Sequence, residues 1–440
     1  MYDGHKIRSY LVLIPFLIGL FYIHYFLQRE DTILLCGFYT LIFAIYLFIL
    51  KYGQFSTKEI LALGIASRLI LFWSLPNLSD DFYRFIWDGR LLANGINPFF
   101  HTPDFFMQNQ VAFSALSPEL YEKLNSKSYF TIYPPISQLV FWISTIFTPN
   151  SITGSVLVMR TIILSFEIGC MVFISKLLKS TNLNASNTLI YALNPLVILE
   201  LTGNLHFEGI MLFFLLGFIY FIQKERIISP SISMAFGIAT KLIPLMFLPL
   251  LIKKLSPVKT IVTYLLIGAT TLLLFLPFLD FQFISGMSGS LDLFFRKFEF
   301  NGGLLFFFRE IGFYFKGYDI IGTLGPWMSI SALVLILIYS FFLFDRNTYL
   351  PTAFIVISFI QLSLATTVHP WYIIPLIAFS ALTKFKFPIV WSSLIFFTYL
   401  GYSVEGYEHP FFIIALEYLV VIPLAIFEIM KFRNNIFVKV

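Results

Sequence analysis

The sequence predicts an all-α, polytopic integral membrane protein with about 11–13 transmembrane helices. Of its 440 residues, 58% are hydrophobic and only 12% are charged. Apolar runs of about 20 residues, enough to cross a hydrocarbon core, recur from one end of the chain to the other. Short Lys and Arg clusters separate these runs, and only residues 77–132 form a long polar stretch. These observations favour one membrane-embedded domain, residues 1–440, without an attached soluble domain.

The apolar runs define the expected helices in order along the chain. We expect spans close to residues 9–27, 32–50, 58–75, 156–178, 185–201, 206–222, 259–279, 321–344, 349–365, 370–383, 387–402 and 411–430. The first run imitates a signal peptide, but it has no small-residue cleavage site and another span follows directly, so we expect a retained helix. Cys36 and Cys170 lie inside apolar runs, where packing rather than a disulfide framework is expected.

The basic clusters predict which ends of the spans face the cytoplasm. They are Lys6/Arg8, Lys51/Lys58, Lys176/Lys179, Lys224/Arg226, Lys253/Lys254/Lys259, Arg346, Lys384/Lys386 and Lys431/Arg433. Alternation of the spans then puts five segments on the outer face: 77–132, 202–205, 280–320, 366–369 and 403–410. A net charge of +5 distributed in this way indicates membrane anchoring and gives no reason to expect nucleic-acid binding.

Two stretches do not fit a simple crossing. Residues 133–149 form a short apolar run opened by two prolines, and we expect an interfacial or re-entrant segment there. Residues 229–252 contain Pro244, Pro249 and a lone Lys241 between two basic ends, which predicts a broken hairpin that enters from the cytoplasm. Non-helical backbone at membrane depth is tolerated where it lines a cavity.

A charge cluster opens the long outer segment. Asp80, Asp81, Asp88 and the two arginines Arg84 and Arg90 crowd into a chain that otherwise avoids charge. Apolar residues recur near helical spacing, and a Gly and a Pro close the run, so the pattern predicts an amphipathic helix over residues 83–94. We expect its apolar face to lie on the membrane surface and to hold the first two acids at the interface.

The Asp80–Asp81 pair has three interpretations from its chemistry alone. A carboxylate at the mouth of a membrane cavity is a candidate general base. The same oxygens are suited to a divalent cation, so a metal at Asp80/Asp81 stays open as a cofactor. The third interpretation is a helix N-cap, in which Asp satisfies free backbone N–H groups at the start of the helix.

Seven motifs in order carry a family resemblance. They are Ser79–Arg90 (SDDFYRFIWDGR), Asn94–Phe99 (NGINPF), Thr131–Pro135 (TIYPP), Gly203–Glu208 (GNLHFE), Thr240–Pro244 (TKLIP), Phe300–Gly303 (FNGG) and His369–Tyr372 (HPWY). This set resembles the GT-C superfamily of polytopic glycosyltransferases, and especially bacterial mannosyltransferase-like proteins that use polyprenyl-phosphate sugars. The resemblance spans residues 78–375 and implies a GT-C-like fold with amphipathic helices in a large first outer loop.

The resemblance implies a sugar transfer on the outer face of a bacterial inner membrane. A sugar, mannose or another hexose, moves with inversion from a polyprenyl-phosphate donor to a hydroxyl of a lipid, glycan, glycolipid or protein acceptor. An aspartate of the first outer loop is the base, and Asp81 fits that position best, with Asp80 as the runner-up. Lys241 is the first candidate to hold the donor phosphate, because an ammonium at membrane depth is costly unless it meets an anion. Arg296 and Arg309 of the second outer loop are the next candidates.

The same resemblance implies a wider set of substrate-binding residues. They are Arg84, Asp88, Arg90, Tyr133, His206, Glu208, Asn301, His369, Trp371 and Tyr372. For His206 the alternative is a helix cap, and for the segment 369–372 it is an interfacial aromatic anchor. Arg160 and Glu167 are seven residues apart on one helix face, so we expect structural interhelical ion pairs from them.

Two other functions compete with glycosyl transfer. A transporter or flippase of a lipid-linked sugar would show paired broken helices in two matching halves. A membrane acyltransferase or polymerase would also need outer polar residues. The sequence has one candidate broken hairpin, no evident repeat and a concentration of acids in an outer loop, which favours the glycosyltransferase.

Overall fold

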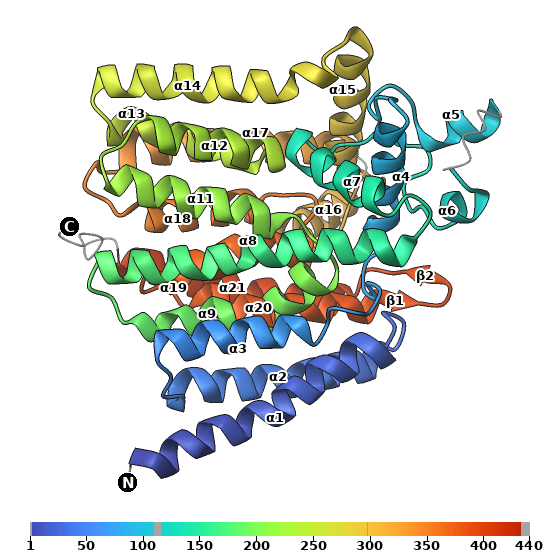
Figure 1. The fold of residues 1–440 in the computed structure, drawn as a ribbon. Helices are drawn as coiled ribbons and strands as arrows, with labels where there is room; N and C mark the ends of the chain where they lie inside the picture. Colours follow the sequence, from blue (N-terminus) through green and yellow to red (C-terminus); the bar gives the residue numbers. More distant parts are fainter. Residues whose placement is uncertain (1, 110–115, 297, 433–440) are drawn as a thin grey trace.

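The computed structural model describes residues 2–109, 116–296 and 298–432, without the side chains of residues 2–9, 285 and 291–296. Most of the helices run side by side across the molecule (Figure 1). Their bounds are α1 Tyr2–Phe26, α2 Thr32–Tyr52, α3 Thr57–Leu69, α8 Ile152–Ser180, η1 Ala185–Thr188, α9 Leu189–Ala192, α10 Pro195–Val197, η2 Ile198–Gly203, α11 Glu208–Gln223, α12 Ile228–Thr240, η3 Ile243–Phe247, α13 Leu250–Lys254, α14 Pro257–Phe275, η4 Leu276–Phe278, α17 Ile321–Ile338, η5 Tyr339–Leu343, α18 Leu350–Ser363, η6 Pro370–Ile373, α19 Ile374–Ala381, α20 Phe387–Leu394, η7 Ile395–Gly401 and α21 Phe411–Phe432.

The other elements gather at the edge of the molecule opposite the two chain ends (Figure 1). They are α4 Asp81–Ala93, α5 Pro103–Gln108, α6 Pro118–Glu122, α7 Pro135–Phe147, α15 Phe281–Arg296, α16 Gly303–Lys316 and the antiparallel strands β1 Tyr402–Ser403 and β2 Gly406–Tyr407. Apart from α7, which lies in the interfacial or re-entrant stretch 133–149, they come essentially from the three longest segments predicted to face outward, 77–132, 280–320 and 403–410. The structure therefore brings these segments together at one edge.

The prediction of an all-α polytopic membrane protein is confirmed. Among the described residues, five helices are long and apolar enough to cross a membrane, or six if a pair bent by 113° counts as one span. That pair is Pro195–Gly203 with Glu208–Gln223, where two uninterrupted spans were expected. The bend lies between η2 and α11, where the helix ends at Asn204 and Leu205 has a positive φ of 64°. The first of the two expected spans is also interrupted, because Asn194 caps a new helix at Pro195. Six further apolar helices have 10–17 residues.

Both irregular stretches expected from the sequence are short or broken helices. Helix α7 has 13 residues, about 20 Å of rise, which is less than the roughly 30 Å of a hydrocarbon core. Helix α12 ends at Thr240, the chain turns at Lys241, and η3 and α13 return toward the end where α14 begins (Figure 1). The turn after α12 lies against α7, because the Ser137 hydroxyl donates to the carbonyl of Thr240 at 2.9 Å.

Helix α4 corrects one expectation. Its range matches the prediction, but nine of its 13 residues are buried, so it lies inside the protein and not on the membrane surface. Gly89 permits this because a Cβ there would stand 2.4 Å from the carbonyl oxygen of Phe141 on α7. Phe85 stacks on Phe141 with ring centroids 4.6 Å apart. The close crossing of α4 and α7 buries both the apolar and the polar face of α4.

Two buried arginines have structural roles, because each joins neighbouring helices. Arg68 of α3 pairs with Glu167 of α8 through Nε and Oε2, 2.7 Å apart. The side chain of Arg160 makes a different contact from the one expected: it donates to the backbone carbonyls of Phe72, Ser74, Thr202 and Gly203. A charge within a bilayer is tolerated only with such partners. Arg68 thus joins α3 to α8, and Arg160 of α8 holds η2 and the segment that follows α3.

Candidate active site

The two adjacent acids at the start of α4 point to different partners. The Oδ2 atom of Asp80 lies 2.5 Å from a guanidinium nitrogen of Arg29, in the turn between α1 and α2. Arg29 also lies over the ring of Tyr402, 5.1 Å from its centroid. Asp80 is therefore neutralised by an ion pair that ties α4 to the N-terminal helices.

Asp81 faces the segment that leads into α7. Its Oδ1 accepts a hydrogen bond of 2.9 Å from the Asn125 amide, and its Oδ2 has a longer contact of 3.4 Å with the Tyr133 hydroxyl. The Asp81 side chain is only partly buried. No cation pairs with Asp81 among the described residues, so its charge, unlike that of Asp80, is not neutralised by an ion pair there.

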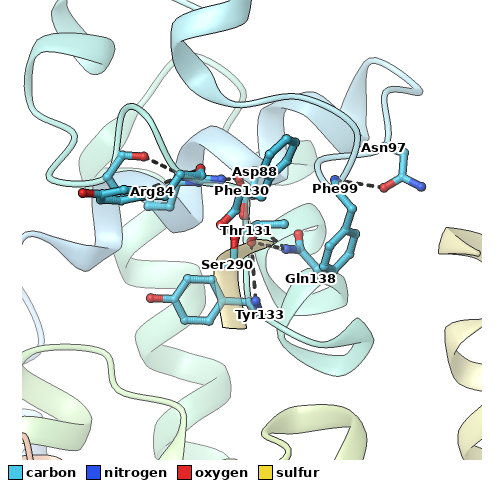
Figure 2. Close-up of polar contacts among 11 residues, drawn as sticks. Arg84, Asp88, Asn97, Phe99, Phe130, Thr131, Tyr133, Gln138 and Ser290 are labelled. Carbon is cyan, nitrogen blue, oxygen red and sulfur yellow. Dashed lines mark hydrogen bonds and ion pairs between the residues drawn. The ribbon is translucent and has the colours of Figure 1, made fainter. Parts of the chain in front are cut away.

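A buried polar network supports this segment from behind (Figure 2). Arg84 donates to Asp88 at 2.8 Å and to the backbone carbonyls of Ser126 and Tyr129 at 3.0 and 2.8 Å. The second carboxylate oxygen of Asp88 accepts from the Gln138 amide at 3.1 Å. Arg84 and Asp88 are thus engaged within the protein. Arg90, two residues after Asp88 on α4, is also buried.

A second charged group lies where the broken hairpin meets α11. The Lys241 ammonium pairs with Oε1 of Glu208 and lies 5.5 Å from the centroid of the Tyr372 ring. The Glu208 side chain is fully buried, while 17% of the Lys241 side chain is exposed. The other oxygen of Glu208 has no hydrogen-bond partner within the described part of the chain. Lys241 is therefore accessible from one side and held by a carboxylate on the other.

Three aromatic rings form a stack beside this pair. Trp371 lies parallel to His206, with centroids 3.5 Å apart, and to His369, with centroids 4.4 Å apart. The Nε2 atom of His206 lies 3.4 Å from Oε2 of Glu200. The other oxygen of Glu200, Oε1, accepts from the Tyr399 hydroxyl at 2.8 Å. Glu200 was missed in the sequence, although an acid within an apolar span is itself a signal for a functional group.

Ring and hydrogen-bond contacts join Asp81 to the groups around Lys241. The Tyr133 hydroxyl lies 3.4 Å from Asp81, and the Tyr133 ring packs on Phe85, whose centroid is 5.4 Å from that of Phe207, between His206 and Glu208. Ser137 of α7 donates to the carbonyl of Thr240, next to Lys241, at 2.9 Å. Four sequence motifs far apart in the chain therefore meet in one centre, with an acid from α4 and an ammonium from the end of α12.

Two predicted residues have their partners outside this centre, and a third has a side chain that is not described. Asn301 donates to both oxygens of Glu417 on α21 at 3.2 Å. Arg309 pairs with Glu299 and Asp319, and its hydrogen bond lowers the pKa of Asp319. Arg296 is in α15, but its side chain is not among those described.

The segment around Asn301 nevertheless supports the ring stack. The backbone of Phe300 accepts from the N–H of Val368 at 2.7 Å, and its own N–H donates to Thr366 at 3.3 Å. His369 follows directly in the chain. The second outer loop thus fixes residues 366–368, the segment that leads into the HPWY motif.

The residues at Asp80 and Asp81 do not form a metal site in the described structure. No group of three or more His, Cys, Asp or Glu side chains suited to a metal ion occurs among the described residues. Divalent cations such as Ca²⁺ take six or more oxygen ligands, and Asp80 is engaged by Arg29. We therefore derive no step through a metal.

A comparison with protein families identifies the chain. The model for the N-terminal domain of alpha-(1->6)-mannopyranosyltransferases, the MptA_B family, matches residues 17–256. The chain belongs to this family. No curated protein matches the chain. The match covers Asp81, His206, Glu208 and Lys241, and it confirms the predicted resemblance to mannosyltransferase-like proteins. The protein is thus a membrane-embedded glycosyltransferase of a mannosyltransferase family.

Proposed function

We propose that this protein transfers mannose from a polyprenyl-phosphate donor to a hydroxyl group of a glycan, glycolipid or protein, with inversion. One observation carries the proposal: a partly exposed carboxylate, Asp81, and an accessible ammonium, Lys241, flank one centre, joined through the rings of Tyr133, Phe85 and Phe207 and through the Ser137–Thr240 hydrogen bond. Sugar transfer from a phosphate needs these two charges, a base for the acceptor and a cation for the leaving group.

In this mechanism the acceptor hydroxyl attacks the anomeric carbon as its proton moves to Oδ2 of Asp81. The new C–O bond forms on the face opposite the phosphate. The bond from the anomeric carbon to the phosphate oxygen breaks, and its electron pair leaves with the polyprenyl phosphate. The phosphate gains negative charge in this step, and the Lys241 ammonium stabilises it. Inversion follows because attack and departure take place on opposite faces.

The surroundings of Lys241 favour a lipid-linked donor. Met211, Phe247, Leu362 and Tyr372 line a small, mostly apolar cavity between α11, η3 and α18, and the Tyr372 ring centroid lies 5.5 Å from the Lys241 ammonium. A phosphate at Lys241 would therefore have apolar side chains next to it. His206 and Glu208 are placed to bind sugar hydroxyls, while Trp371 offers an aromatic face.

The proposed orientation is that of the basic clusters. The edge formed by α4–α7, α15, α16 and β1–β2 faces the extracytoplasmic side of a bacterial inner membrane, and both chain ends face the cytoplasm. The acceptor then reaches Asp81 from outside, while the lipid donor stays in the bilayer.

The decisive test compares two neighbouring carboxylates. Purified protein in sealed proteoliposomes is incubated with labelled polyprenyl-phosphate mannose and a panel of acceptors. We expect Asp81→Asn to lower turnover by about 10²–10⁴-fold while donor binding persists, because only the base is removed. Asp80→Asn is the matched control and should keep most of the activity, because Asp80 serves an ion pair. Near-normal turnover in Asp81→Asn would refute the assigned base, and donor movement across the bilayer without transfer would favour a flippase.

A further inference from the structure

We infer that residues 125–133 form a positioning strap for the catalytic base, with Asn125 as its contact residue. Asn125 holds Oδ1 of Asp81 and so leaves Oδ2 as the atom that receives the acceptor proton. The inference rests on the proposed function, in which Asp81 is the base, and adds a positioning residue that the sequence motifs do not contain.

The two oxygens of Asp81 differ in how firmly they are held. The Asn125 amide donates to Oδ1 at 2.9 Å, whereas the Tyr133 hydroxyl is 3.4 Å from Oδ2. A hydrogen bond to an ionised carboxylate is among the strong ones at the shorter distance and weak at the longer one. An acceptor hydroxyl can therefore replace the Tyr133 contact at little cost, while Asn125 keeps the carboxylate from rotating.

Arg84 anchors the strap directly behind Asn125. One of its terminal nitrogens donates to the carbonyls of Ser126 and Tyr129 at 3.0 and 2.8 Å, so a single planar group holds two points of the strap (Figure 2). Nε of Arg84 is in turn held by Asp88 at 2.8 Å. Arg84 is 3% exposed and Asp88 is fully buried. The anchor belongs to the rigid core of α4, the same helix that begins with Asp81.

Asp88 also secures the far end of the strap. Its second oxygen accepts from the Gln138 amide, which donates to the Thr131 hydroxyl as well, both at 3.1 Å. Ser290 of α15 donates to the carbonyl of Phe130 at 3.1 Å and holds the middle (Figure 2). These hydrogen bonds fix a loop whose outer contact, the Asn125 amide, is exposed. This amide donates to Oδ1 of Asp81.

The test separates positioning from substrate binding by measuring kcat and the KM for donor in Asn125→Ala and Asn125→Asp. We expect Asn125→Ala to lower kcat by about tenfold to 100-fold, because a misplaced catalytic group costs that much. The KM for donor should stay within about twofold. Asn125→Asp should lose more turnover, since a second carboxylate would face Oδ1 of Asp81. Thermal unfolding should remain near wild type because the Asn125 side chain is exposed.

Asn109→Ala is the matched control. Asn109 is an exposed asparagine of the same outer loop whose amide donates to the carbonyl of Phe105 at 2.8 Å, and its loss should leave kcat unchanged. The inference is overturned if Asn125→Ala keeps wild-type kcat, if the KM for donor rises as much as kcat falls, or if Asn109→Ala is equally impaired. Asp81→Asn is measured in parallel. If Asp81→Asn stays active, the proposed function fails; if it is inactive and Asn125→Ala is normal, only the strap fails.

Discussion

Replacing Lys241 tests both the ion pair and the donor site. In Lys241→Met the carboxylate of Glu208 remains, fully buried and without a cation. Removing one partner of a buried ion pair costs about 3–5 kcal/mol, and the partial exposure of Lys241 favours the lower end, about 3 kcal/mol. Glu208→Gln should cost less, about 1–2 kcal/mol, because the ammonium keeps some solvent and the Tyr372 ring.

The double variant distinguishes the pair from its surroundings. Lys241→Met combined with Glu208→Gln removes both charges and should cost about 1–2 kcal/mol, so the cycle should give a coupling energy of about 2–3 kcal/mol. Unfolding in mixed detergent micelles supplies these free energies. A coupling energy near zero would show that the two side chains do not interact as described.

The contribution of Lys241 to donor binding is measured separately from its contribution to stability. Equilibrium binding of labelled polyprenyl-phosphate mannose to Lys241→Met should weaken about tenfold, which is about 1.4 kcal/mol. The double variant should bind equally weakly, although it is more stable, because the phosphate has lost its cation in both. Lys259→Met is the matched control, since this exposed lysine lies at the start of α14, and it should bind normally. Wild-type affinity in both Lys241 variants would make Lys241 purely structural.

Two further predictions concern packing and orientation. Gly89→Ala should destabilise the protein by about 1–3 kcal/mol and lower turnover, because the new Cβ would stand 2.4 Å from the carbonyl oxygen of Phe141; Gly268→Ala, with nothing within 4 Å, should unfold like wild type or later. If both alanines behave alike, the close crossing of α4 and α7 is wrong. Cysteines introduced at Val404 and Asn182 should react with an impermeant reagent from opposite sides of the membrane, because these positions lie on opposite sides in the proposed orientation. Both native cysteines are buried and should not add to the labelling. Labelling of both positions from one side would overturn the orientation.

Local pattern was enough to predict the fold class and most helix positions. Long apolar runs have few alternatives to helices in a bilayer, because each backbone polar group needs a partner within its own segment. The helix at residues 83–94, the short segment after Tyr133 and the break at Lys241 were predicted from periodicity, Pro and Gly. The family resemblance also came from the sequence, because the ordered motifs carry it without knowledge of their contacts.

Contacts between distant segments were beyond the reach of local pattern. Asp80 and Asp81 are adjacent and identical in chemistry, and only the approach of Arg29 to one and Asn125 to the other separates them. Helix α4 was expected on the membrane surface, because its apolar spacing is the same whether lipid or α7 covers it. Glu200 stood out locally as an acid in an apolar span, but its partner Tyr399 is 199 residues away.

The sequence by itself therefore determined the membrane-embedded helical architecture, the family and the chemical types available to the site. The tertiary structure decided which charges are neutralised and which stay accessible. The physical reason is range: helix formation in a membrane depends on neighbours within a few residues. An ion pair or a hydrogen bond depends instead on distances of about 3 Å between atoms that the chain brings together only when it has folded.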